Sequence, residues 1–75
     1  MAEDLSALKD RAAELLAGYR LAEAVEALRS VADAEPAEGR WTLRAGDALR
    51  QLGRVKEAIE MYRRAARTYA SRGLL

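Results

Sequence analysis

The sequence predicts an all-α fold built from two tandem helix–turn–helix hairpins, and three observations support this. Alanine, leucine, arginine and glutamate dominate the 75 residues, whereas only six residues are β-branched. Apolar residues recur at three- and four-residue steps in four separate stretches. The second half of the chain also repeats the first half at a spacing of 34 residues. We therefore expect residues 1–75 to form a single domain of four helices.

The first hairpin is predicted from two apolar stripes. The first stripe comprises Leu5, Leu8, Ala12, Leu15, Leu16 and Tyr19, and Gly18 should end its helix. The second stripe comprises Leu21, Ala24, Val25, Leu28, Val31 and Ala32. This second helix should stop near Pro36, because the residue before a proline avoids the α region.

The second hairpin has the same two-part pattern. Its first stripe comprises Trp41, Ala45, Ala48, Leu49 and Leu52, and its helix should end at Gly53. Its second stripe comprises Val55, Ala58, Ile59, Tyr62, Ala65, Ala66 and Tyr69, with an end at Gly73. The glycines and the proline leave only short turns between helices, so consecutive helices should pair.

The internal repeat is clearest where residues 20–32 are aligned with residues 54–66. Six of these thirteen pairs are identical. The conservative or size-matched pairs along the repeat are Leu21/Val55, Val25/Ile59, Ala12/Gly46 and Leu15/Leu49. Small residues therefore match small residues and large match large, which indicates that the repeat unit is one helical hairpin.

A helical hairpin of this length, with these small residues, resembles the tetratricopeptide repeat. The matching positions are the small residues Ala12, Gly46, Ala24 and Ala58, the large residues Leu28 and Tyr62 one turn later, and Pro36. Two helices can pack closely only where side-chain volume is missing at their crossing. The resemblance implies repeat one at about 5–38 and repeat two at about 39–72, stacked as a short right-handed solenoid. Gly53 keeps the glycine of the turn within a repeat, whereas the first repeat has Tyr19 there.

The tail, residues 73–75, resembles the opening of a further helix that is then cut off. Solenoids need capped ends and usually more than two repeats. We therefore expect either that the chain continues into a larger protein or that another copy or a partner covers this end. The alternative is a frayed terminus with two harmless leucines.

The composition argues against catalysis and against a cofactor or a metal site. The chain has no cysteine and no histidine, so it lacks a thiolate nucleophile, an imidazole base and the usual zinc ligands. The carboxylate pairs Glu23/Glu26 and Glu57/Glu60 are expected to face solvent, with Glu60 pairing with Arg64 one turn later. No apolar run approaches the roughly 18 residues that span a bilayer. We expect a soluble, cytoplasmic protein that is not an enzyme.

The resemblance implies a partner-binding groove on the first helices of the two repeats. Its expected residues are Lys9, Ala13, Leu16, Ala17, Arg40, Leu43, Arg44, Asp47, Arg50 and Gln51. These residues mix basic and apolar character, which favours a partner peptide or helix with acidic and apolar residues. The chain has no asparagine, so the carboxylate clamp known in part of the family is not expected. The predicted function is that of an adaptor or scaffold in protein–protein interaction.

The charge distribution leaves two further hypotheses open. Residues 1–39 carry a net charge of −5, whereas residues 40–75 carry +6. A basic patch is expected at Arg54, Arg63, Arg64, Arg67 and Arg72. Acidic and basic halves could join copies head to tail as a homo-oligomer. The patch could instead bind nucleic acid or another anionic surface, although the acidic half should repel a duplex.

Overall fold

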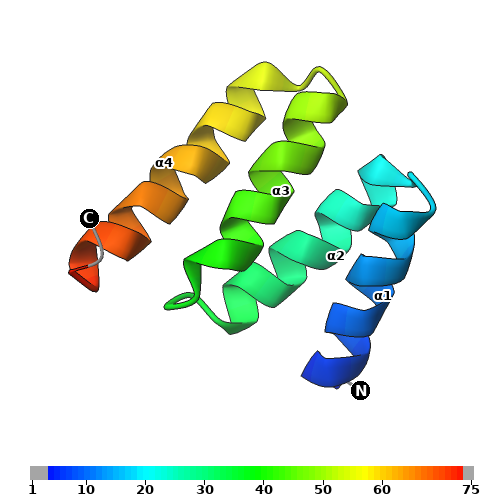
Figure 1. Cartoon of the computed structure of the whole chain (residues 1–75), viewed down its shortest axis with the longest axis horizontal. Coiled ribbons are helices and arrows are strands. Elements are labelled where there is room, and N and C mark those ends of the chain that lie inside the picture. The colour runs from blue at the N-terminus through cyan, green and yellow to red at the C-terminus, as the bar shows by residue number, and fades with distance from the viewer. Residues whose placement is uncertain (1–3, 74–75) are drawn as a thin grey trace.

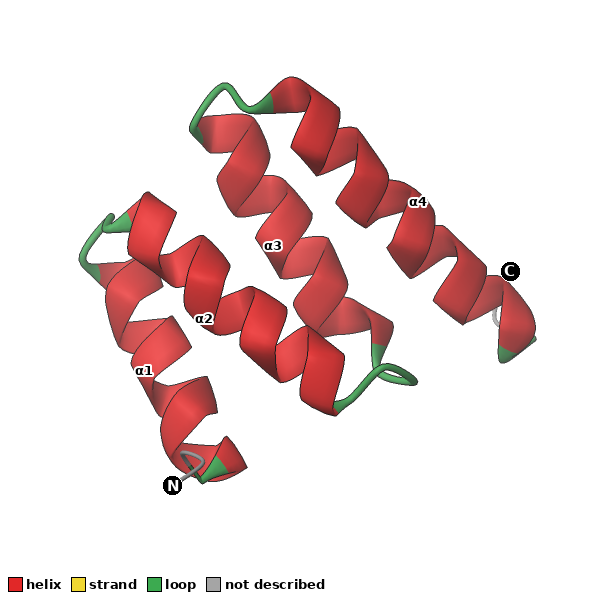
Figure 2. Ribbon diagram, turned by 180° about the vertical axis from the view of Figure 1, so that it is seen from behind, coloured by secondary structure: helices red, strands yellow, loops and turns green. Residues whose placement is uncertain are grey.

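The structure, a computed structural model that describes residues 4–73, consists of four helices. These are α1 (Leu5–Ala17), α2 (Leu21–Ala34), α3 (Gly39–Gln51) and α4 (Val55–Ser71). The helices lie side by side in chain order, and each packs against its neighbours in sequence (Figures 1 and 2). Residues 4–73 contain helices and turns but no strand, so the predicted all-α fold is confirmed. Four helices fit two repeats.

The two hairpins share one geometry at the 34-residue spacing. Both α1 and α3 are 13 residues long, and α2 and α4 begin 34 residues apart. The Arg20 N–H donates to the Leu15 carbonyl at 2.9 Å, and the Arg54 N–H donates to the Leu49 carbonyl at the same distance. This bond closes a Schellman motif at the end of the first helix of each hairpin. The turns are therefore equivalent in their backbones as well as in their positions.

The Schellman turn requires a left-handed residue, and the two hairpins supply different ones. Gly53 adopts φ 79° and Tyr19 adopts φ 56°. Gly18 caps α1 as predicted, but with an ordinary φ of −88°. The expectation that Tyr19 continues the apolar stripe of α1 is wrong, because the turn directs this side chain outward and leaves it 81% exposed. A non-glycine residue in this conformation costs about 1 kcal/mol.

The core consists largely of small side chains where helices cross. Ala12 and Ala24 are fully buried, and Ala58 is 2% exposed, as the small-residue pattern predicts. The largest fully buried side chains are Leu28, Leu49, Val25, Val31 and Thr42. Both middle helices, α2 and α3, bury more residues than the outer two because each is packed on both sides.

Two glycines of α3 make room for two tyrosines of α4. A Cβ at Gly46 would lie 2.9 Å from the Tyr62 ring, and a Cβ at Gly39 would lie 3.0 Å from the Tyr69 ring. Both distances are shorter than ordinary carbon–carbon contacts. The glycine–tyrosine pairs therefore set how closely these two helices approach.

Several residues predicted to be in the core are instead exposed near or on α4. Val55 is 56% exposed, Ile59 43% and Leu52 37%, and Ala66 is also exposed. The α2 equivalent of Ile59 is Val25, which is fully buried. The difference arises because α2 is packed between α1 and α3, whereas α4 packs against α3 alone among the described helices and reaches α2 only through long side chains.

Within residues 4–73, no helix combines the length and apolar character that crossing a bilayer requires. The expected opening of a further helix falls mainly on residues 74–75, which lie outside the described residues.

Candidate partner-binding site

The residues predicted to line the groove occupy the accessible sides of α1 and α3. On α3 the buried residues are Gly39, Trp41, Thr42, Ala45, Gly46, Ala48 and Leu49. The predicted groove residues fill the positions between them: Arg40, Leu43, Arg44, Arg50 and Gln51 are exposed and Asp47 is half-buried. On α1, Ala13 and Ala17 are exposed, whereas Lys9 and Leu16 are half-buried. We define the α1/α3 face as these ten residues.

Three cations of the α1/α3 face converge on one buried indole. The Trp41 ring centroid lies 5.1 Å from the Cζ atoms of both Arg40 and Arg44 and 5.4 Å from Lys9 Nζ. These distances fall within the range of cation–π attraction. Lys9 also lies 2.8 Å from a Glu35 carboxylate oxygen. Among the described residues, the two arginines contact the ring and no carboxylate, so positive charge accumulates at this end of α3.

Trp41 is held in place by packing rather than by polar contacts. Its side chain is 7% exposed, and its buried Nε1 has no hydrogen-bond partner among the described residues. An unpaired buried donor costs about 1–3 kcal/mol. The apolar stripe predicted burial for Trp41 but not its role under the cations. The arginines one position before and three positions after it are the sequence signal for that role.

The opposite end of α3 carries a neutralising network instead. The Tyr62 hydroxyl donates to Asp47 Oδ1 at 2.5 Å and accepts from Arg50 Nε at 3.3 Å. The hydrogen bond with Tyr62 raises the pKa of Arg50 above its ordinary value. Because Asp47 lies beside Arg50, this end of the face is close to balanced in charge. The face is therefore cationic mainly around Trp41.

The predicted basic patch is divided between internal contacts and solvent. Three of its arginines hold other parts of the chain: Arg54 contacts Glu57, Arg64 contacts Asp33, and Arg72 donates to the Ala37 carbonyl. Arg63 and Arg67 are exposed and have no partner among residues 4–73. Within the described part of the chain, the patch thus offers two unpaired cations rather than five.

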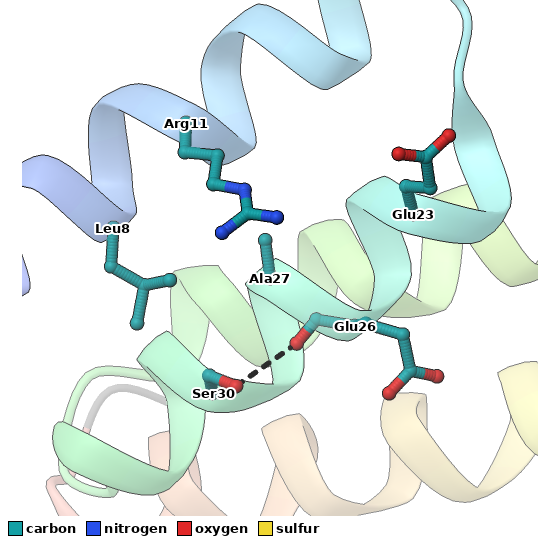
Figure 3. A pocket seen from close by; sticks show the side chains of 6 residues that line it. All are labelled: Leu8, Arg11, Glu23, Glu26, Ala27 and Ser30. Carbon is teal, nitrogen blue, oxygen red and sulfur yellow. Dashed lines mark hydrogen bonds between the residues drawn. The ribbon is translucent and has the colours of Figure 1, made fainter. Parts of the chain in front are cut away.

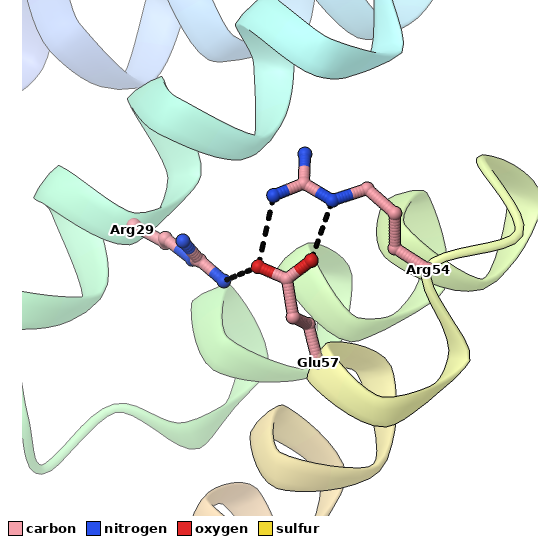
Figure 4. Close-up of polar contacts among 3 residues, drawn as sticks. All are labelled: Arg29, Arg54 and Glu57. Carbon is pink, nitrogen blue, oxygen red and sulfur yellow. Dashed lines mark hydrogen bonds and ion pairs between the residues drawn. The ribbon is translucent and has the colours of Figure 1, made fainter.

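A shared carboxylate links the two hairpins on the side of α2 and α4. Glu57 accepts from Arg54 of its own hairpin at 2.6 and 2.8 Å and from Arg29 of α2 at 3.2 Å (Figure 4). The hydrogen bonds from Arg54, and after them that from Arg29, lower the pKa of Glu57. The same local pair recurs in the first hairpin, where Arg20 lies 2.7 Å from Glu23. Glu57 therefore does not simply face solvent as predicted.

The expected pairing of Arg64 with Glu60 is also wrong. Arg64 reaches across to α2, where its Nη2 lies 3.1 Å from Asp33 Oδ1 and 3.4 Å from the Ala32 carbonyl oxygen. Because α2 and α4 pack against the same helix, α3, this more distant acid comes within reach of the long Arg64 side chain. Glu57 and Arg64 together tie α4 to the C-terminal half of α2.

Two cavities lie outside the α1/α3 face. One of about 270 Å³ lies between α1 and α2 and is lined by Leu8, Arg11, Glu23, Glu26, Ala27 and Ser30 (Figure 3). The other, of about 450 Å³, follows the turn at residues 35–38 and is bordered by Arg72. Neither cavity was expected from the sequence.

Two hairpins of one geometry, stacked through alanine and glycine crossings, define a helical-repeat protein. The sequence model of the tetratricopeptide repeat matches residues 15–72, and the chain belongs to this family. Comparison with curated proteins and with solved structures gave no match. Membership of the family indicates a protein–protein interaction module.

Proposed function

We propose that this protein binds a partner peptide or helix with acidic and apolar residues on the α1/α3 face. The observation that carries the proposal is the pair of arginines, Arg40 and Arg44, held 5.1 Å from the buried Trp41 ring with no carboxylate partner among the described residues. The family supplies the general role, and this cluster supplies the chemistry of the partner. The proposal includes no catalysis and no cofactor.

The cluster suits a carboxylate for physical reasons. A guanidinium binds a carboxylate through two parallel hydrogen bonds, and such charge-assisted bonds are stronger than neutral ones. Stacking on Trp41 restricts both arginine side chains before binding, which lowers the entropy lost on association. Leu43 lies between them in the sequence of α3 and is 38% exposed, so it offers an apolar contact on the same face. An acidic residue followed by an apolar one therefore fits this surface.

Trp41 provides a direct measurement, because it is the only tryptophan in the chain. Its fluorescence should be recorded while an amphipathic peptide containing glutamate and leucine is added. We expect a saturable change that weakens as salt rises, because exposed charges are screened. The same peptide with lysine in place of glutamate should give no saturable change.

Two charge-reversed variants locate the site. Arg40→Glu with Arg44→Glu should weaken binding of the acidic peptide by about tenfold or more, corresponding to at least about 1.4 kcal/mol. Arg63→Glu with Arg67→Glu makes the same change in net charge on α4 and should leave binding intact. Equal losses in both variants would mean that net charge alone attracts the peptide. Unchanged binding by the first variant would place the site elsewhere.

A further inference from the structure

The packing of α2 onto the second hairpin provides a template for a second interface. At the 34-residue spacing, α4 corresponds to α2, and the α1/α2 hairpin corresponds to the α3/α4 hairpin. Repeating the internal packing once more would place α4 of one chain on the α1/α2 hairpin of another. Both surfaces can be compared with the internal contact, residue by residue.

The α4 side of this contact is open and apolar. Ile59 is 43% exposed and Val55 is 56% exposed, whereas their equivalents on α2, Val25 and Leu21, are fully buried and half-buried. The internal packing covers these positions on α2. The same positions on α4 have no covering helix among residues 4–73.

The other side of the contact is the cavity between α1 and α2. Two of its lining residues are Glu23 and Ser30. They correspond to Glu57 and Arg64, the two residues of α4 that form ion pairs with α2. A third, Ala27, takes the place of the larger Met61. The cavity therefore lies where the first hairpin would receive a helix, and its volume of about 270 Å³ is consistent with the smaller side chain (Figure 3).

The charges of the two surfaces are complementary. In the internal contact, Arg29 of α2 reaches Glu57, which Arg54 already holds. The equivalent of Arg29 on α4 is Arg63, which is exposed and unpaired among the described residues. The equivalent of Glu57 is Glu23, which Arg20 holds in the same local pair. The basic second half and the acidic first half of the chain reinforce this match.

We propose that α4 of one copy docks in the α1/α2 cavity of a second copy, with Arg63 pairing with Glu23 and with Val55 and Ile59 covered. The contact is heterologous, because it joins two different surfaces of the same chain. Such a contact adds further copies in a row unless it closes into a ring. It involves the opposite ends of the stack rather than the α1/α3 face, so it goes beyond the proposed partner binding.

The contact between copies is weaker than the internal one. Facing α2, α3 buries Ala45 and Ala48, whereas the α1 equivalents are Arg11 and Glu14, which are exposed. Charged side chains prevent the close alanine packing found inside the chain. Association should therefore be reversible and dependent on salt, since ion pairs at an exposed edge are screened.

The first measurement is the mass of the full chain in solution, by light scattering across protein concentrations. At low salt the mean mass should rise above the monomer value of 8.3 kDa as concentration increases, and it should return to that value at high salt. A monomer at every concentration in low salt overturns the proposal. The α4 face would then be left for a helix of a different protein.

A charge exchange tests the geometry. Arg63→Glu and Glu23→Arg should each remain monomeric alone, because like charges then meet in the contact, whereas a mixture of the two should regain the wild-type increase in mass. The Arg20–Glu23 pair lost in the second variant is exposed and contributes little to stability. Circular dichroism should show that both variants keep the helical spectrum of the wild type. Failure of the folded mixture to associate overturns the proposal.

A second pair of variants controls for net charge. Lys56→Glu and Asp10→Arg make the same changes in charge at exposed positions. The residues 34 positions away, Ala22 and Arg44, stay exposed where the two hairpins of one chain pack together, so Lys56 and Asp10 should lie outside the proposed contact. Each of these variants should associate like the wild type. Loss of association in either one would show that overall charge, rather than the proposed contact, governs assembly. The Arg40→Glu with Arg44→Glu variant should also associate, which separates this surface from the α1/α3 face.

Discussion

The glycine–tyrosine contact between α3 and α4 gives a quantitative test of the packing. Replacing Gly46 with alanine should stabilise the helix by about 1 kcal/mol, because alanine has the higher helix propensity. The new Cβ, however, would lie 2.9 Å from Tyr62 Cε1 and 3.0 Å from Cδ1. The ring cannot move aside freely because its hydroxyl donates to Asp47. Overpacking of this kind costs about 1–3 kcal/mol.

The two effects together predict a net loss for Gly46→Ala. We expect the free energy of unfolding to fall by about 1 kcal/mol, with a decrease in Tm of roughly 4–8 °C for a domain of this size. The first hairpin shows how to remove the clash, since it has Ala12 and Leu28 at the equivalent positions and both are fully buried. In a Tyr62→Leu background, Gly46→Ala should therefore stabilise the protein by about 0.5–1 kcal/mol.

The assay is urea unfolding of the wild type, both single variants and the double variant, followed by far-ultraviolet circular dichroism. The expected coupling free energy between the two sites is about 2 kcal/mol, within the range found for residues in contact. Gly18→Ala is a matched control, because its Cβ would come no closer than 3.5 Å to its nearest neighbour, the Glu14 carbonyl oxygen. It should have the same effect in both backgrounds. An equal effect of Gly46→Ala in both backgrounds would refute this account of the helix approach.

Three further predictions follow from single positions. Tyr19→Gly should raise the free energy of unfolding by about 0.5–1 kcal/mol, because Tyr19 has φ 56° where the second hairpin has Gly53. A lower free energy of unfolding in urea would contradict this. Ala58→Leu should cost about 1–3 kcal/mol or more by overpacking a helix crossing, whereas Arg67→Ala on the exposed side should be nearly silent in thermal unfolding. Glu57 has a pKa lowered by its arginine partners from an ordinary 4.5, so its contribution to stability is present above about pH 4.5 and is lost as pH falls through the lowered pKa. Glu57→Gln should make the free energy of unfolding less dependent on pH below about 4.5. If the pH dependence in this range is unchanged, Glu57 is not its source.

The sequence was sufficient to determine the helices and how they pair. Helix propensity and the turn residues act locally, and the 34-residue repeat requires the same hairpin twice. Small residues at Ala12, Gly46, Ala24 and Ala58 mark the crossings because only positions without bulk allow two helix axes to approach. These features depend on neighbours in sequence or on the repeat itself, and the structure confirms them.

The candidate site depended on contacts that no local pattern specifies. The sequence places Arg40 and Arg44 on an exposed stripe, but only the fold brings Lys9 of another helix to the same Trp41 ring. The fold likewise gives Arg64 a partner on α2 in place of the acid one turn earlier in its own helix. A long exposed side chain can form ion pairs of similar energy with several acids. Which acid it contacts therefore depends on which helices the packing brings near.

The exposure of apolar residues on α4 was likewise decided by the tertiary structure and not by the sequence pattern. The apolar pattern of α4 matches that of α2, and pattern alone predicts the same burial for both. Val25 is fully buried on α2, which packs between α1 and α3, whereas Ile59 on α4 is 43% exposed. Periodicity determines which side of a helix is apolar, whereas burial depends on whether another element lies against that side, and only the tertiary structure determines this.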